Sequence, residues 1–102
     1  MKEIILSADS KAKVYLVPDA IANNLHKYCM EFLMEWLPKS PDAQKYRVKL
    51  GDIVGYSFTE IDFIDYLNKW VFPDEQSVFV KELDFYAYEL PVEYEKYPEF
   101  NF

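Results

Sequence analysis

The chain has one histidine and one cysteine, His26 and Cys29, and they lie three residues apart. On a helix this spacing points both side chains to neighbouring sides, which suits a Cys-His nucleophile pair or half of a zinc site. Zinc would need two further ligands, which only carboxylates can supply, and a nucleophile would need an oxyanion hole that no motif indicates. The pattern therefore favours Cys29 as a small core residue and His26 at the edge of the core.

Other motifs that carry chemistry are missing from the sequence. The chain holds only two glycines, Gly51 and Gly55, from which no glycine-rich phosphate loop can be built. It has no G-x-S-x-G nucleophile elbow and no H-E-x-x-H metal motif. Carboxylates are plentiful, but nothing indicates a cleft that would shift the pKa of one of them. We therefore expect no catalytic site, no metal and no cofactor, and a small enzyme of unknown class is kept as an alternative.

The elements that would carry these residues begin with a hairpin and a helix. Two short apolar runs, 4–6 and 13–17, flank a polar stretch that is typical of a turn. Pro18 suits the first turn of a helix, and Pro38 is expected to end that helix at Leu37. The residues on its core-facing side at 100° per residue are Ile21, Leu25, Tyr28, Cys29, Phe32 and Trp36.

This first helix has more apolar surface than one sheet can cover. Met30, Met34 and Leu37 continue the apolar arc around its side. In one explanation the C-terminal segment folds back over these side chains. In the other they form an exposed contact patch for a partner or for a second copy of the chain.

A second hairpin is predicted in the middle of the chain. Gly51 and Asp52 form a two-residue link of the kind found in tight hairpins, between the runs 45–50 and 53–58. In that register the predicted cross-strand pairs are Leu50 with Ile53, Val48 with Gly55, Arg47 with Tyr56 and Lys45 with Phe58. The small basic cluster would then lie over aromatic rings, as stems packed on a solvated face.

A second helix and further strands follow this hairpin. Thr59 and Asp62 form a partial capping box for a helix that runs to about Val71. The runs 77–80 and 83–88 are typical of strands, and the sequence leaves open whether a turn separates them. From Glu89 onward, closely spaced prolines predict an irregular strap, and its rings at Tyr94, Tyr97 and Phe100 suggest one row laid on a surface.

The order β-β-α-β-β-α-β-β predicts an α+β fold, with two helices packed on an antiparallel sheet built from short hairpins and an extended C-terminal strap. A chain of 102 residues is long enough for one core and too short for two. We therefore expect a single compact domain over 1–102, with the irregular strap 89–102 packed on it.

Charge and aromatic residues are unevenly distributed along the chain. Residues 59–102 contain 12 of the 19 aromatic residues, and their 3 lysines against 11 acids give −8, whereas residues 1–58 carry +1. The total of −7 argues against nucleic acid as a partner. A lone cysteine and the lack of a long apolar run indicate a cytoplasmic protein without a membrane anchor.

These features favour a small acidic intracellular protein-binding module, such as an inhibitor, an immunity-type protein or a regulatory partner, that engages a basic protein surface. The candidate binding residues are Asp84, Tyr86, Tyr88, Glu89, Glu93, Tyr94, Glu95 and Tyr97. The opposing interpretation is that these rings seal the core and these acids keep the chain soluble. Two other functions are alternatives: a structural homo-oligomer, such as a homodimer, joined through Met30, Met34 and Leu37, and an inhibitor that mimics nucleic acid.

Overall fold

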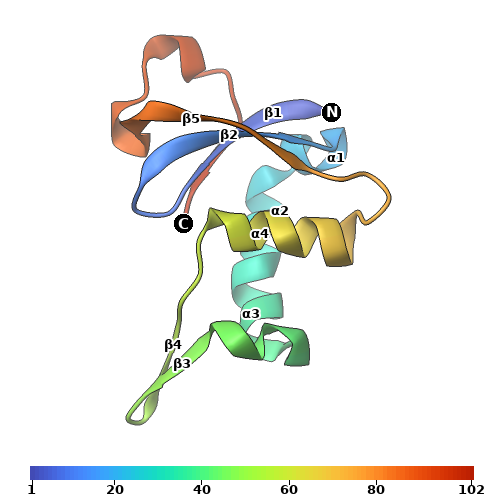
Figure 1. Cartoon of the computed structure of the whole chain (residues 1–102), viewed down its shortest axis with the longest axis vertical. Helices are drawn as coiled ribbons and strands as arrows, with labels where there is room; N and C mark the ends of the chain where they lie inside the picture. The colour runs from blue at the N-terminus through green and yellow to red at the C-terminus, as the bar shows by residue number, and fades with distance from the viewer.

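The N-terminal hairpin lies in the middle of a four-stranded sheet (Figure 1). The computed structural model describes residues 1–102. Strand β1 (Lys2–Ser7) pairs antiparallel with β2 (Lys11–Val17). Strand β5 (Val78–Tyr86) pairs with the other side of β2, and the short β6 (Glu99–Asn101) pairs with β1, giving the order β5-β2-β1-β6. Both outer strands therefore come from the C-terminal part of the chain.

The sheet differs from the predicted one in two respects. β6 runs parallel to β1, so the sheet is mixed rather than antiparallel. The expected strands 77–80 and 83–88 form one strand, β5, which continues through Lys81 and Glu82. Val14 pairs with Lys81 and Tyr15 pairs with Phe79, so Val80 is an extra residue on β5. The sequence left open whether a turn separates the two runs, and the structure has a bulge there instead.

The helices cover one face of this sheet (Figure 1). The first helical stretch consists of α1 (Asp19–Asn23), α2 (Leu25–Glu31), the π-helical turn η1 (Phe32–Trp36) and α3 (Leu37–Lys39). The second consists of α4 (Glu60–Tyr66) and the π-helical turn η3 (Leu67–Val71). None of the helices has the length and the apolar composition that a membrane span requires.

The helix ends largely follow their sequence signals. At the start of α4, Ile61 N donates to Thr59 Oγ1 at 3.3 Å and Thr59 N donates to Asp62 Oδ2 at 2.8 Å, so the capping box is confirmed. The expected end of the helix at Leu37 is wrong by two residues. Pro38 is accommodated in the first turn of α3, directly after a wide π-helical turn, and the helix continues to Lys39.

The main core lies between the sheet and the helices. Phe32 is fully buried at its centre, and the rings that surround it with centroids between 5.2 and 6.0 Å away belong to Trp36, Phe58, Phe63, Tyr66 and Phe102. Cys29 is a fully buried core residue, as predicted, and burial raises the pKa of its thiol. His26 is exposed beside the ring of Phe100, at 5.8 Å between centroids.

The strap covers the opposite face of the sheet. A second, smaller core consists of Ile5, Ala12, Val14 and Leu83, with Tyr94 and Tyr97 half-buried against it. The 3-10 turn η4 (Ala87–Glu89) leads into the strap, and a second such turn, η5 (Val92–Tyr94), lies within it. The single row of rings expected from the spacing is wrong. β6 carries Phe100 to the helix side, where it packs against the main core.

The second hairpin is a separate two-stranded sheet that projects from the body (Figure 1). It comprises β3 (Arg47–Leu50) and β4 (Ile53–Tyr56), and it follows the 3-10 helix η2 (Pro41–Tyr46). Three predicted pairs, Leu50–Ile53, Val48–Gly55 and Arg47–Tyr56, are confirmed. The pairing of Lys45 with Phe58 is wrong, because Lys45 belongs to η2.

We expect Phe102→Ala to lower the free energy of unfolding by about 2 kcal/mol. Its ring packs between Phe32, Phe58 and Phe63, and its partial exposure reduces the effect below the ~3–5 kcal/mol typical of fully buried phenylalanines. Urea unfolding followed by circular dichroism measures the change. Tyr88→Ala, at a ring that is 85% exposed, is the control and should change stability by less than about 0.5 kcal/mol. Equal effects of the two substitutions would show that the end of the strap is not packed.

Candidate functional site

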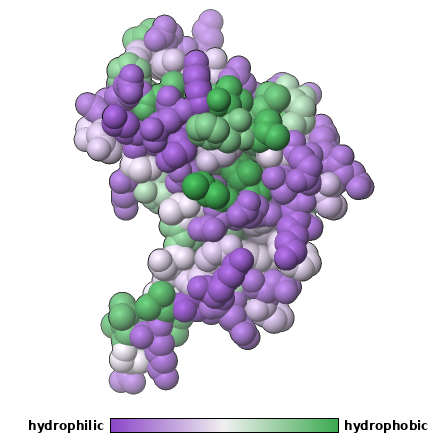
Figure 2. All heavy atoms as spheres, viewed as in Figure 1, coloured by the Kyte–Doolittle hydropathy of each residue, from purple (hydrophilic) through white to green (hydrophobic).

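A groove lies between α4 and the strands β2 and β5. Its volume is about 500 Å³, within the ~300–1,000 Å³ typical of ligand sites. The residues that line this α4-β5 groove are Lys13, Tyr15, Ile61, Ile64, Asp65, Asn68, Ser77 and Phe79. Apolar residues gather over β5 and the adjoining side of α4 (Figure 2). The groove therefore combines apolar walls with a few polar groups, the composition usual for a binding site.

An almost buried ion pair lies beside the groove. Lys13 Nζ is 2.5 Å from Glu60 Oε1, and the side chains are 17% and 2% exposed. Glu82, on the outer strand, is a more distant second partner at 3.9 Å from Lys13 Nζ. Removing two charges from water is costly, and only close pairing offsets this cost. The pair therefore ties the first turn of α4 to β2 and fixes one wall of the groove.

Asn68 fixes the opposite end of the groove. Its side-chain amide donates to Ser77 O at 3.0 Å and its Oδ1 accepts from Ser77 N at 2.6 Å. This pair of bonds holds the start of β5 against η3. Ser77 itself is 4% exposed, and its hydroxyl has no hydrogen-bond partner within the chain. Leaving a buried hydroxyl unpaired is unfavourable, so Ser77 is an unsatisfied polar group beneath the groove surface.

Tyr15 contributes a protonated phenol to the groove wall. Burial, together with the negative charges of Glu60 and Asp65, raises its pKa to about 12. Its ring meets that of Phe79 edge-on, with 5.7 Å between centroids. At neutral pH the groove therefore presents a hydroxyl group and not a phenolate at this position.

The strand β5 borders the groove and has an unpaired outer edge. It is the last strand in the order β5-β2-β1-β6. Near the groove it exposes Val78, Phe79 and Val80, by 48%, 56% and 43%. Charged residues begin only at Lys81. Natural proteins usually protect such edges with charges or cover them, so this apolar stretch is an unprotected pairing surface.

The acidic end of β5 brings together four of the predicted binding residues. Asp84 and Tyr86 belong to the strand, and Tyr88 and Glu89 follow in η4. The rings of Tyr86 and Tyr88 stack at 5.7 Å with an interplanar angle of 12°. Tyr86 N donates to Glu89 Oε1 at 3.1 Å, which holds this turn closed. All four residues are exposed.

The other predicted binding residues lie elsewhere on the strap. Glu93 and Glu95 are exposed, but Tyr94 and Tyr97 pack half-buried on the second core. The centroids of their two rings are 5.6 Å apart. These two rings therefore fit the core-sealing interpretation. The predicted set is not one surface but an exposed group at the end of β5 and a partly buried group on the strap.

The proposed oligomer patch is wrong as a continuous surface. Leu37 is only 1% exposed, because η2 and the start of β3 fold back on α3 and Arg47 Nε donates to Leu37 O at 2.8 Å. Met30 is half-buried, and only Met34, at 61% exposed, is open to solvent. One exposed methionine does not make an interface.

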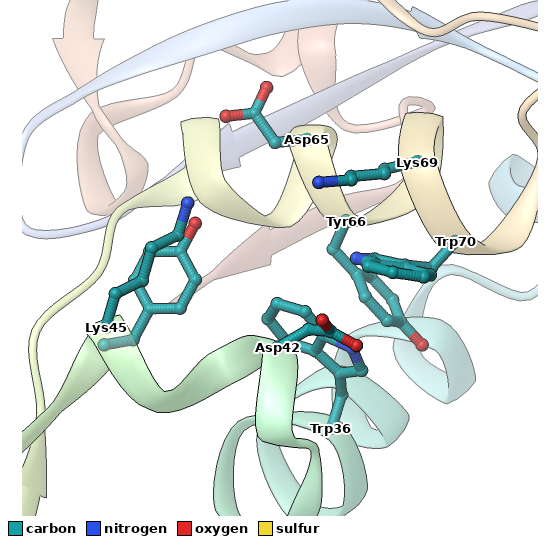
Figure 3. A pocket seen from close by; sticks show the side chains of 8 residues that line it. Trp36, Asp42, Lys45, Asp65, Tyr66, Lys69 and Trp70 are labelled. Carbon is teal, nitrogen blue, oxygen red and sulfur yellow. The ribbon is translucent and has the colours of Figure 1, made fainter.

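A second hollow lies between η2 and the end of the second helix (Figure 3). The rings of Trp36, Tyr66 and Trp70 line it, while the Asp65 carboxylate points away from these rings. Its volume is only about 100 Å³, well below the ~300 Å³ at which ligand sites begin. The Trp36 and Tyr66 rings are 5.0 Å apart, so this hollow serves chiefly as an aromatic contact between the two helical stretches.

Sequence reasoning missed the α4-β5 groove because its residues come from three distant segments. One local signal was present. Lys13 alternates with Ala12 and Val14, so it shares a strand face with Tyr15 and Val17. A lysine on the core-facing side of a strand needs a buried acidic partner. That signal indicates an ion pair, although it does not identify Glu60.

Comparisons of the chain with protein-family models, with curated proteins and with solved structures give no match.

We expect Lys13→Met to lower the free energy of unfolding by about 3 kcal/mol, because Glu60 would remain buried without its partner. The double variant Lys13→Met/Glu60→Leu should recover most of this loss. As a control, Glu35→Gln breaks the exposed Glu35–Lys39 pair and should change stability by less than about 1 kcal/mol. Chemical denaturation compares the four proteins. Equal losses for Lys13→Met and Glu35→Gln would contradict the importance of the buried pair.

Alkaline pH should reveal the protonated Tyr15. Folding raises the pKa of Tyr15 to about 12, so the unfolded chain, in which this pKa is ~10, loses the proton first. The contribution of the Tyr15 phenol to the free energy of unfolding is therefore fully present below about pH 10. It falls by roughly 2 kcal/mol as the pH approaches about 12. Tyr15→Phe should flatten this decline in urea unfolding measured across that range. A decline should remain in this variant, because burial also raises the pKa of the Cys29 thiol and of Tyr46 and Tyr66. An unchanged pH profile would refute the assignment to Tyr15.

Proposed function

We propose that the chain is a small protein-binding module that pairs with an extended, basic segment of a partner protein along the outer edge of β5. The observation that carries this proposal is the unpaired edge of β5, nine residues long, which is apolar beside the α4-β5 groove and acidic at its far end. An extended segment can add to such an edge as a further strand, with main-chain hydrogen bonds for affinity and side chains for specificity.

Charge supports a basic partner. The groove residue Asp65 is exposed and forms no ion pair, and Asp84 also lacks one. Glu82 is only a distant partner of Lys13, which already pairs with Glu60. Lysine or arginine side chains on an added strand would supply the missing positive charge. Carboxylates that face a basic partner speed association and set its orientation, and their effect weakens with salt.

The side chains along β5 suit an alternating partner. Successive residues of an added strand point to opposite faces, so every second side chain can reach the groove. The walls formed by Ile61 and Phe79 suit an apolar side chain. Further along the strand, the exposed rings of Tyr86 and Tyr88 provide flat contact surfaces of the kind found at interface centres.

A short peptide with alternating valine and lysine, acetyl-TVKVKVT-amide, tests this proposal. In amide NMR spectra we expect it to shift the resonances between Phe79 and Asp84, and we expect its glutamate counterpart, acetyl-TVEVEVT-amide, to bind more weakly. Asp84→Lys should weaken binding of the lysine peptide roughly threefold or more, because it replaces attraction with repulsion. Higher salt should also weaken it.

Asp52→Lys is the matched control, because it makes the same change of charge at the tip of the projecting hairpin. It should leave peptide affinity almost unchanged. Binding that is indifferent to Asp84→Lys and to salt, or resonance shifts confined to the strap, would refute the β5 site.

A further inference from the structure

The projecting hairpin has an apolar face that is largely exposed towards its tip. Cross-strand partners share a face, so Val48, Leu50 and Ile53 project together with the small Gly55. These three side chains, which we call the hairpin face, are 39%, 66% and 70% exposed. Figure 2 shows the apolar residues gathered at this end of the molecule. A sheet with one apolar face is normally stable only when that face packs on another element.

The hairpin is nevertheless firmly specified at its turn and at its base. Gly51 has φ 64, in the left-handed region, which suits the first central position of a type II′ turn. At the base, Ser57 N donates to Tyr46 O at 2.8 Å, and the Arg47 side chain donates to the carbonyls of Leu37 and Ser40. Between turn and base, the strands have no support from the body. Isolated two-stranded hairpins are marginally stable in water, so this one gains from a covering partner.

The charge distribution favours the hairpin over the rest of the chain as the place where two copies meet. Residues 41–57 carry three basic and two acidic side chains, which gives 3 − 2, or +1, and the rest of the chain therefore carries −7 − 1, or −8. A two-fold axis brings each surface against its own copy, so contacts over the rest of the chain would bring surfaces of net negative charge together. The hairpin is the projecting segment in which two copies can meet without this repulsion.

We propose that the hairpin face packs against the hairpin face of a second copy of the chain around a two-fold axis. The hairpin stands at one end of a molecule whose longest extent is 44 Å, so the acidic C-terminal parts of the two copies would stay apart (Figure 1). Screening over a Debye length of about 8 Å at physiological salt then limits their repulsion. The edge of β5 lies outside this contact and remains free.

Sedimentation of the full chain between about 10 μM and about 1 mM tests the dimer, because a small interface of this kind gives micromolar or weaker affinity. The expected result is a shift from monomer to dimer with concentration. Ile53→Glu should raise the dissociation constant roughly tenfold to a hundredfold, since it removes one buried aliphatic side chain per copy and adds like charge. Leu50→Glu provides a second variant with the same expectation. Circular dichroism checks that both variants keep the wild-type fold.

Val92→Glu is the matched control, because it places the same charge at an exposed valine of the strap, 77% exposed. It should leave self-association unchanged.

Salt distinguishes this contact from the β5 site. Added salt should strengthen the dimer by screening the two acidic chains, whereas it should weaken binding of the basic peptide at β5. A wild-type chain that stays monomeric at about 1 mM, a dimer that survives Ile53→Glu and Leu50→Glu, or equal loss in Val92→Glu would overturn the proposal.

Discussion

The organising constraint of this structure is that the N-terminal hairpin is apolar on both of its faces. Consecutive residues Ile4, Ile5 and Leu6 are all fully buried, although neighbours in a strand point in opposite directions. Helices therefore cover one face and the strap covers the other. Phe102 connects the strap on one face with the core beneath the helices on the other, because it follows β6 and inserts among the rings around Phe32. The strap is thus part of the core and not an appendage to it.

The elements that the sequence predicts well depend on residues close together in the chain. The helix periodicity around Phe32, the capping box at Thr59 and the tight turn at Gly51 each involve only a few consecutive residues, and all three occur in the structure. The parallel pairing of Ile5 with Glu99 joins segments too far apart for any local signal. The sequence offered the C-terminal segment or a partner as the cover of Leu37. The element that buries it is η2, which has no helical periodicity in the sequence.

The candidate site was predictable only in part for the same physical reason. Exposed acids and rings at the end of β5 can be read from local composition, since Asp84, Tyr86 and Tyr88 follow one another closely. Whether a ring is exposed depends on what packs over it, and the sequence did not separate Tyr88 from the half-buried Tyr94. The groove exists because a buried charge pair holds α4 against β2, and an asparagine bridge holds η3 against the start of β5. Such an arrangement is a property of packing and leaves little trace in any one segment.

The pairing of β6 with β1 sets an order for folding during synthesis. Ser7 and Asn101, whose side chains bond at 2.9 Å, are separated by 94 positions, and contacts of this range form slowly because they close a long loop. While residues 1–98 leave the ribosome, β1 keeps an open edge and one side of the Phe32 cluster lacks its covering rings. A nascent chain in this state would expose aggregation-prone apolar surface. Cotranslational folding of this chain therefore depends on how quickly the final strand is delivered.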